Sequence, residues 1–359
     1  MSLVKKAKLF KKLSSSGVKC LACQRYCLIS EGQVGFCKTR LNKNDKLYTL
    51  TYGILNGFQI DPIEKKPLYH FYPGSLVLSL GSFGCNYRCK QCLNPHCSWG
   101  KEANRVLGDL KKEGKPKITS PKEVVKLALE KNCPGIAFTY NEPAIWPEYV
   151  YDVAKLAKKK GLLTVFVTNG SWSKEGLKYL APVIDALNID IKGFYKETLE
   201  KMGAFYGEVF KMTKRAVKKY KIHTELTTLV IPTINDSSKE LKKITNWIKK
   251  IDPEIPWHLS RFDPSLSPSK SFKKLPFTPI KTLEKAYKIG KKAGLKHIYI
   301  WAPAKTWNES LYSKEDTICP QCEELVIKRE AWRPTLVKIK KEDGKIKCRN
   351  CGYSLKLWL

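Results

Sequence analysis

The sequence predicts an α/β fold: a partial (β/α)6 TIM-like barrel with an N-terminal cysteine-rich knuckle and β extension, and a C-terminal zinc ribbon. Two observations predict it. Short apolar strands alternate with amphipathic helices over residues 75–302, as in a parallel sheet covered by helices. Cysteines gather near both ends of the chain at spacings that suit metal ions. We therefore expect three parts, residues 1–74, 75–302 and 303–359, with an open doubly wound sheet as the alternative core.

The expected strands are short and apolar, and helices are expected between them. The strands are predicted at residues 76–80, 135–140, 162–168, 184–191, 223–231 and 257–261, with 297–301 as a candidate seventh. Helices are predicted from Pro121 after the N-cap Ser120, and at 144–160, 173–180, 208–220, 236–251 (N-cap Asp236) and 278–293 (Pro279 at the first helical position). Six strand–helix units favour a partial barrel over an eightfold one. Residues 1–19 form a basic N-terminal segment for which we consider a short helix. In residues 46–52 the side chains alternate in character as they do in a strand.

Composition narrows the function classes. The 359-residue chain can bury a full core, and no apolar run approaches the length that crosses a bilayer. The first sixteen residues lack the apolar region of a secretory signal, so we expect a cytoplasmic protein. The net charge of +33 makes nucleic acid a partner to consider, although the lysines are spread over helix faces and we do not favour it. We find neither the dinucleotide-binding glycine motif nor a P-loop.

Eleven of the thirteen cysteines fall into three groups, which favours metal binding over disulfides in a cytosolic chain. The first group is Cys20, Cys23, Cys27 and Cys37. It suits zinc or a second iron–sulfur cluster, and we favour a structural metal. The last group, Cys319, Cys322, Cys348 and Cys351, has the C-x2-C-x25-C-x2-C spacing of a zinc ribbon. Cys97 and Cys133 stand outside the groups, and we do not expect Cys97 to bind a metal.

The middle group follows the strand at 76–80. Cys85, Cys89 and Cys92 stand at C-x3-C-x2-C, with no fourth cysteine at ferredoxin spacing. Three thiolates leave an open metal position at which a small molecule can bind and react. The site of chemistry is therefore predicted here, because the other two groups are closed sets of four.

Polar side chains recur where the predicted strands end. In barrels of parallel strands the active site lies at these carboxyl ends. Because they would meet the cysteine loop there, we predict that they surround its ligand. They are Asn141, Glu142, Thr168, Asn169, Asp190, Lys192 and His258. A separate histidine, His70, is predicted to be a packed core residue.

These motifs resemble a known superfamily. C-x3-C-x2-C behind a strand, an acidic motif after the second strand and a partial barrel are similar to the radical S-adenosylmethionine (SAM) enzymes. The chain is most similar to the AmmeMemoRadiSam-system family, relatives of the pyruvate formate-lyase activating enzyme. The resemblance covers almost the whole chain. It includes residues 20–37, 61–68, 84–86, 138–143, 167–170, 190–194, 257–262 and the closing ribbon.

The resemblance implies that a [4Fe–4S] cluster on Cys85, Cys89 and Cys92 cleaves SAM reductively to a 5′-deoxyadenosyl radical. It implies an electron donor of the ferredoxin or flavodoxin type and an unknown substrate, a protein or peptide among the options. Glu142 would then accept from the ammonium of SAM or its surroundings, and Asn169 and Thr168 would bond the ribose or the carboxylate. Lys192 would offset the carboxylate of SAM, with Asp190 holding the lysine in place or contacting the ribose. His258 would reach the ribose or adenine side.

Three positions depart from the family pattern. Gln91 stands where an aromatic usually packs near the adenine, Leu93 replaces a common glutamine, and Val167 replaces the aspartate of activating enzymes. Two other functions remain in view. An RNA-modifying radical enzyme would use the positive charge, and a non-catalytic RNA-binding protein would hold zinc at all three cysteine groups.

Overall fold

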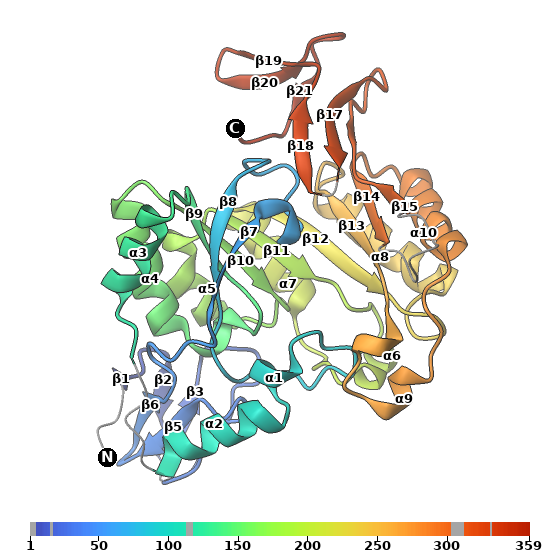
Figure 1. The fold of residues 1–359 in the computed structure, drawn as a ribbon. Coiled ribbons are helices and arrows are strands. Elements are labelled where there is room, and N and C mark those ends of the chain that lie inside the picture. The colour runs from blue at the N-terminus through green and yellow to red at the C-terminus, as the bar shows by residue number, and fades with distance from the viewer. Residues whose placement is uncertain (1–4, 15–16, 113–117, 303–311, 331) are drawn as a thin grey trace. The chain divides into compact units, whose positions relative to one another are not determined.

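The computed structural model describes residues 5–14, 17–112, 118–302, 312–330 and 332–359 (Figure 1). Contacts divide the chain into two units, which are described separately. Unit 1 comprises 1–61, 76–187 and 203–222, and unit 2 comprises 62–75, 188–202 and 223–359. Each combines helices with parallel strands of the central sheet and with small antiparallel sheets, so the α/β class is confirmed. The three-part division of the sequence stays a prediction.

Unit 1 begins with small antiparallel sheets. Two three-stranded sheets have the orders β1-β6-β5 and β2-β3-β4. Their strands are β1 (Lys5–Lys6), β2 (Phe10–Lys12), β3 (Val18–Cys20), β4 (Leu28–Ile29), β5 (Arg40–Lys43) and β6 (Lys46–Thr49). A helix over residues 1–19 is therefore wrong for the described part of that segment. This N-terminal segment instead forms strands that pair with distant ones, for example Lys5 opposite Thr49. Val18 and Leu47 are fully buried in a small core that includes Cys20.

Parallel strands follow in unit 1. Residues of β8 (Leu76–Leu80) and β10 (Leu163–Thr168) pair in parallel with β9 (Gly135–Phe138) on either side. Most of their side chains are buried, as expected of strands covered on both faces. Helices α3 (Pro121–Glu130), α4 (Pro147–Lys159) and α5 (Lys174–Leu180) lie in the connections (Figure 1). The predicted start of α3 is confirmed, because Ser120 caps it in a full capping box.

The other elements of unit 1 are shorter. They are β7 (Phe58–Pro62), α1 (Pro95–Ser98), α2 (Lys101–Lys112), the 3-10 turns Pro143–Ile145 and Ala181–Val183, α7 (Val209–Lys214) and a π turn at Arg215–Lys219. The helix predicted over 144–160 is thus divided into a 3-10 turn and α4. Strand β11 (Ala186–Asp190) crosses the boundary between the two units in the chain.

Unit 2 carries further parallel strands. Strand β13 (Trp257–Arg261) pairs in parallel with β12 (His223–Val230) and β14 (Ile298–Ala302), and β15 (Tyr312–Lys314) adds an antiparallel strand beside β14. The seventh strand is thereby confirmed. The helices are α6 (Lys196–Lys201), α8 (Ser238–Ile251), α9 (Lys270–Lys273) and α10 (Ile280–Ala293), with 3-10 turns at Ile63–Lys65 and Pro264–Leu266.

Two predicted helix starts in unit 2 are wrong by one residue. Ser237, and not Asp236, caps α8 by accepting from the backbone N–H of Glu240. The Asp236 carboxylate instead accepts from the backbone N–H of Thr233, 2.9 Å away, and so closes the preceding turn. Pro279 stands at the N-cap of α10 and not at its first helical position.

The C-terminal part of unit 2 consists of two three-stranded sheets, β16-β17-β18 and β19-β20-β21. The strands are β16 (Thr317–Ile318), β17 (Leu325–Glu330), β18 (Arg333–Leu336), β19 (Ile339–Glu342), β20 (Lys345–Cys348) and β21 (Ser354–Leu355). Cys319 and Cys348 are fully buried in its small core with Val326 and Ile327. No helix among the described residues is both long and apolar enough to span a membrane.

Candidate functional site

The loop that follows β8 holds three thiols, those of Cys85, Cys89 and Cys92. Its entry is possible only for glycine, because Gly84 has φ +96° and a Cβ there would lie 2.7 Å from the carbonyl oxygen of Cys37. The backbone N–H of Gly84 donates to the carbonyl of Cys97, 2.8 Å away. Cys97 therefore supports the loop through its backbone.

Asn141, at the end of β9, clamps the entry of this loop. Its Nδ2 donates to the carbonyl of Gly84 (3.0 Å), and its Oδ1 accepts from the backbone N–H of Ser82 (3.1 Å). The amide thus joins the ends of two adjacent parallel strands. A contact of Asn141 with the cofactor stays a prediction.

A second set of bonds fixes the loop to the end of β10. Asn86 Nδ2 donates to Ser171 Oγ (2.6 Å), and Asn86 Oδ1 accepts from Asn169 Nδ2 (2.9 Å). Asn169 Oδ1 in turn accepts from Ser171 Oγ at 2.7 Å. Asn169 is thus next to the cysteine loop, as its predicted role requires. Asn86 and Ser171 are not among the predicted site residues, although Asn86 lies in the motif 84–86 and Ser171 directly follows the motif 167–170.

Glu142 is the buried acidic centre of this network, with 2% of its surface exposed. Its carboxylate accepts from the backbone N–H groups of Ala144 and Asn169, from Thr168 Oγ1 and from Trp172 Nε1, at 2.7 to 3.0 Å. Burial raises the pKa of Glu142 above its ordinary value, although these donors act in the opposite direction. Trp172 was missed, because only the fold brings its indole to this carboxylate.

The Cys85 thiol lies in a buried environment near an acidic side chain. Burial, with the neighbouring Cys89 and Glu142, raises the pKa of the Cys85 thiol well above its ordinary value. A metal ion reverses this effect, because it stabilises the thiolate that binds it. Gln91, between the second and third cysteines, is 4% exposed, and neither its Oε1 nor its Nε2 has a hydrogen-bond partner among the described residues.

Arg88 ties the loop to the N-terminal knuckle. Its guanidinium donates to the carbonyls of Cys85 (2.7 Å) and Phe36 (2.7 Å) and lies over the Phe36 ring at 4.3 Å. This role of Arg88 could not be predicted from the sequence, because a basic residue between two cysteines is common on solvated loops.

The remaining predicted cofactor residues belong to unit 2. Lys192 Nζ lies 3.0 Å from Asp190 Oδ2, so the predicted pairing is present. His258 Nε2 lies 2.7 Å from Glu225 Oε2 and the ring stacks on Tyr299. Their contacts with a cofactor stay predictions.

Glu225 was missed by the sequence analysis. It also accepts from His223 Nε2 (2.9 Å) and from the backbone N–H groups of Tyr69 and His70. Burial alone would raise the pKa of Glu225, but the two histidines hold it well below its ordinary range. His70 is buried and hydrogen-bonded to Tyr299, as predicted of a core histidine.

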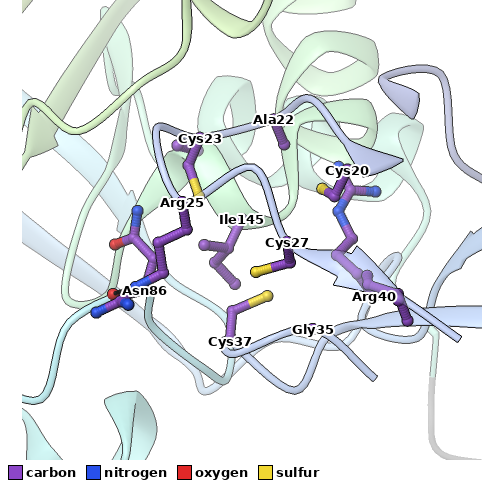
Figure 2. Close-up of a pocket in the computed structure, with 12 residues that line it drawn as sticks. Cys20, Ala22, Cys23, Arg25, Cys27, Gly35, Cys37, Arg40, Asn86 and Ile145 are labelled. Carbon is purple, nitrogen blue, oxygen red and sulfur yellow. Dashed lines mark hydrogen bonds between the residues drawn. The ribbon is translucent and has the colours of Figure 1, made fainter. Parts of the chain in front are cut away.

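The two four-cysteine groups differ in geometry. Cys20, Cys23, Cys27 and Cys37 line a cavity together with Arg25, Arg40 and Asn86 (Figure 2). In the C-terminal group, Cys319 and Cys351 sulfurs are 3.6 Å apart and those of Cys322 and Cys348 are 3.7 Å apart. Sulfurs bound to one zinc at about 2.3 Å would be about 3.8 Å apart, so this group fits a tetrahedral ion.

The chain is similar to known proteins. The family model of the radical SAM superfamily matches residues 80–246. An uncharacterized protein of Methanocaldococcus jannaschii is 37% identical over 361 residues, covering 99% of this chain and 100% of that protein. The pyruvate formate-lyase-activating enzyme of Clostridium pasteurianum is 24% identical over 174 residues, covering 47% of this chain and 67% of that enzyme.

Solved structures with similarity include a domain of the pyruvate-formate lyase-activating enzyme from Bacteroides vulgatus, with TM-score 0.39 and 17% identity over 46% of this chain and 98% of that one. A radical SAM methyltransferase from Sphaerobacter thermophilus has TM-score 0.47 and 14% identity, covering 66% of this chain and 68% of that one.

Proposed function

The chain belongs to the radical SAM superfamily, and on this premise we propose that Cys85, Cys89 and Cys92 hold a [4Fe–4S] cluster whose fourth iron binds SAM. When bound and reduced, this cluster supplies the electron that splits the S–C5′ bond of SAM into methionine and a 5′-deoxyadenosyl radical. The observation that carries the proposal is the loop of three cysteines behind β8, anchored by the ends of β9 and β10.

The donor set supports this cofactor. All three ligands are thiols, which iron–sulfur clusters prefer. Among the described residues, only the C-terminal cysteines have ligand atoms mutually within 4.8 Å, so these three are too widely spaced to share one ion. The buried, unpartnered amide of Gln91 offers both a donor and an acceptor to an adenine or a ribose beside them.

We assign the roles in unit 1 by chemistry. Glu142 is the acceptor for the SAM ammonium or for its surroundings, and Asn169 and Thr168 bond the ribose or carboxylate. Asn141 holds the loop and contributes to the same pocket. Support comes from the hydrogen bonds that join these four residues to the cysteine loop and to one another.

The roles in unit 2 rest on residue type and on local pairing. Lys192 offsets the carboxylate of SAM, and Asp190 orients the lysine through their 3.0 Å ion pair. His258 serves the ribose or adenine side, with Glu225 setting the orientation of its ring.

Finer assignments follow from the resemblance. We place the chain in the AmmeMemoRadiSam branch, with a partial barrel of six units and a protein or peptide as substrate. The donor would be a reduced ferredoxin or flavodoxin and the compartment the cytoplasm. The ribbon of Cys319, Cys322, Cys348 and Cys351 would hold a structural zinc, supported by its short sulfur–sulfur distances.

Anaerobically reconstituted protein, SAM and dithionite test the reaction. We expect 5′-deoxyadenosine from the wild type and a loss of at least about a hundredfold in Cys89→Ala, because an incomplete cluster cannot bind SAM. Cys133→Ala is the matched control, since Cys133 is a buried thiol outside the three groups and should leave the rate unchanged. Equal rates in Cys89→Ala and wild type would refute the assignment.

A second candidate is modification of RNA. It is favoured by one feature, a groove of unit 2 lined by lysines of α8 and α10: Lys242, Lys281, Lys285, Lys288 and Lys292. Binding of tRNA through this groove would weaken steeply with salt. Lys285→Glu/Lys288→Glu should then lower the affinity by at least about tenfold, and unchanged, salt-insensitive binding would eliminate this candidate.

A further inference from the structure

We infer that Cys20, Cys23, Cys27 and Cys37 bind a second [4Fe–4S] cluster, in direct contact with the Cys85–Cys92 loop. The sequence alone favours a structural metal at this group. Three observations on unit 1 point instead to the cluster: the spacing of the thiols, the charges that face them, and the bonds that link the two cysteine loops.

The first observation is the spacing. The four thiols line one cavity, yet among the residues that the structure describes only the ribbon cysteines lie mutually within 4.8 Å. One zinc ion requires that closeness, because all its sulfurs lie about 2.3 Å from a single centre. A four-iron cube places each thiolate on a different corner, so its ligands stand much farther apart.

The second observation is charge. A cube held by four thiolates is negative overall, and two arginines line the cavity from opposite sides (Figure 2). Arg40 is fully buried; its terminal nitrogens donate to the Glu148 carboxylate, whereas its Nε has no hydrogen-bond partner among the described residues. Arg25 stands over the ring of Phe36 at 3.5 Å. A buried N–H with no acceptor is costly, and a cluster sulfur or thiolate beside it would accept its bond.

The third observation is that the knuckle contacts the Cys85–Cys92 loop. Gly84 packs against the carbonyl of Cys37, Arg88 bridges the carbonyls of Phe36 and Cys85, and Arg25 Nε donates to the carbonyl of Asn86. Asn86 itself also lines the cavity of the four cysteines. A second cluster would therefore lie close enough to the first for their unpaired electrons to interact.

Metal analysis of the full chain tests the inference. The wild type and C85A/C89A/C92A are purified and reconstituted anaerobically with iron, sulfide and zinc all available. We expect about eight iron atoms per wild-type chain and about four in the triple variant, which retains cluster absorbance that SAM does not alter. Because that variant lacks the first site, failure of the proposed function would not affect this result.

The opposite result is equally clear. About four iron atoms in the wild type and almost none in the triple variant, with about two zinc ions in each, would overturn the inference. C23S/C27S is the complementary variant and should hold about four iron atoms whose spectrum SAM still changes.

A second measurement decides the matter where a variant does not fold. The electron paramagnetic resonance spectrum of the dithionite-reduced wild type should show two interacting clusters, with signals broadened or split relative to C23S/C27S. A single, unbroadened signal from one cluster per wild-type chain would contradict the inference without recourse to any variant.

Discussion

The N-terminal knuckle and the C-terminal ribbon each present four cysteines, yet the two groups differ in spacing and in surroundings. In the ribbon, two pairs of sulfurs lie 3.6 and 3.7 Å apart and the set closes around a single point. In the knuckle, the four thiols surround a cavity that two arginines also line. The number and type of ligands are the same, so the spacing and the surrounding charges indicate which metal each group suits.

The difference follows from how the backbone presents the thiols. Each half of the ribbon is a tight turn in which the residue after its second cysteine, Glu323 or Gly352, donates its N–H to the carbonyl of the first cysteine. Both residues have a positive φ, 59° and 74°. The knuckle draws its ligands from β3, from a turn that starts at Cys23, from the residue directly before β4 and from the segment before β5.

The largest effect is expected from removing ribbon ligands. Cys319→Ala/Cys348→Ala should lose about one zinc per chain and expose residues 312–359 to protease, because so small a core depends on its metal. Metal analysis and limited proteolysis measure both effects. Iron content should not change, and a chain that keeps its zinc would show that the ribbon cysteines are not its ligands.

The knuckle should depend on a buried ion pair as well as on metal. Arg40 donates to Glu148 at 2.8 Å and both side chains are buried. Glu148→Ala leaves the guanidinium without its counterion, and we expect the free energy of unfolding to fall by about 3–5 kcal/mol. Denaturant unfolding measures this loss.

Glu130→Ala is the control for that experiment. Glu130 forms an exposed pair with Lys126, so its removal should change the free energy of unfolding by less than about 0.5 kcal/mol. Similar effects of the two substitutions would mean that the Arg40–Glu148 pair does not hold the knuckle to α4.

The smallest effect concerns the two turns of the ribbon. Glu323 adopts a backbone conformation that favours glycine, so Glu323→Gly should slow zinc loss to a chelator by about twofold, the equivalent of about 0.5 kcal/mol. Gly352→Ala should act in the opposite direction, since nothing near it would clash and only the strain of the left-handed conformation remains. Equal rates in both variants would show that these turns do not limit the zinc site.

Much of the α/β core could be predicted from the sequence, because local patterns determine it. The strand at residues 76–80, the cap at Ser120 and the strand at 257–261 were predicted with correct bounds. The basic N-terminal segment was interpreted wrongly because its strands exist only through pairing with distant partners, such as Lys5 with Thr49. The N-cap of α8 is Ser237 and not the predicted Asp236, because the Asp236 carboxylate accepts from the backbone N–H of Thr233 in the preceding turn.

The candidate site was predictable as a set of residue types and not as a network. The cysteine loop, Glu142 and Asn169 were recognised from their positions after strands. The partners of Glu142 were not, because Trp172 lies thirty residues away and reaches it only in the folded chain. The distances between the thiols of the knuckle could likewise not be predicted, because a sequence contains the number of cysteines and not the distances between their sulfurs.

The most direct test of the comparison is the metal content of the full wild-type chain, reconstituted anaerobically with iron, sulfide and zinc together. Two clusters and one ribbon predict about eight iron atoms and about one zinc ion per chain. About four iron atoms with about two zinc ions would show that the knuckle and the ribbon hold the same metal, and would contradict the account.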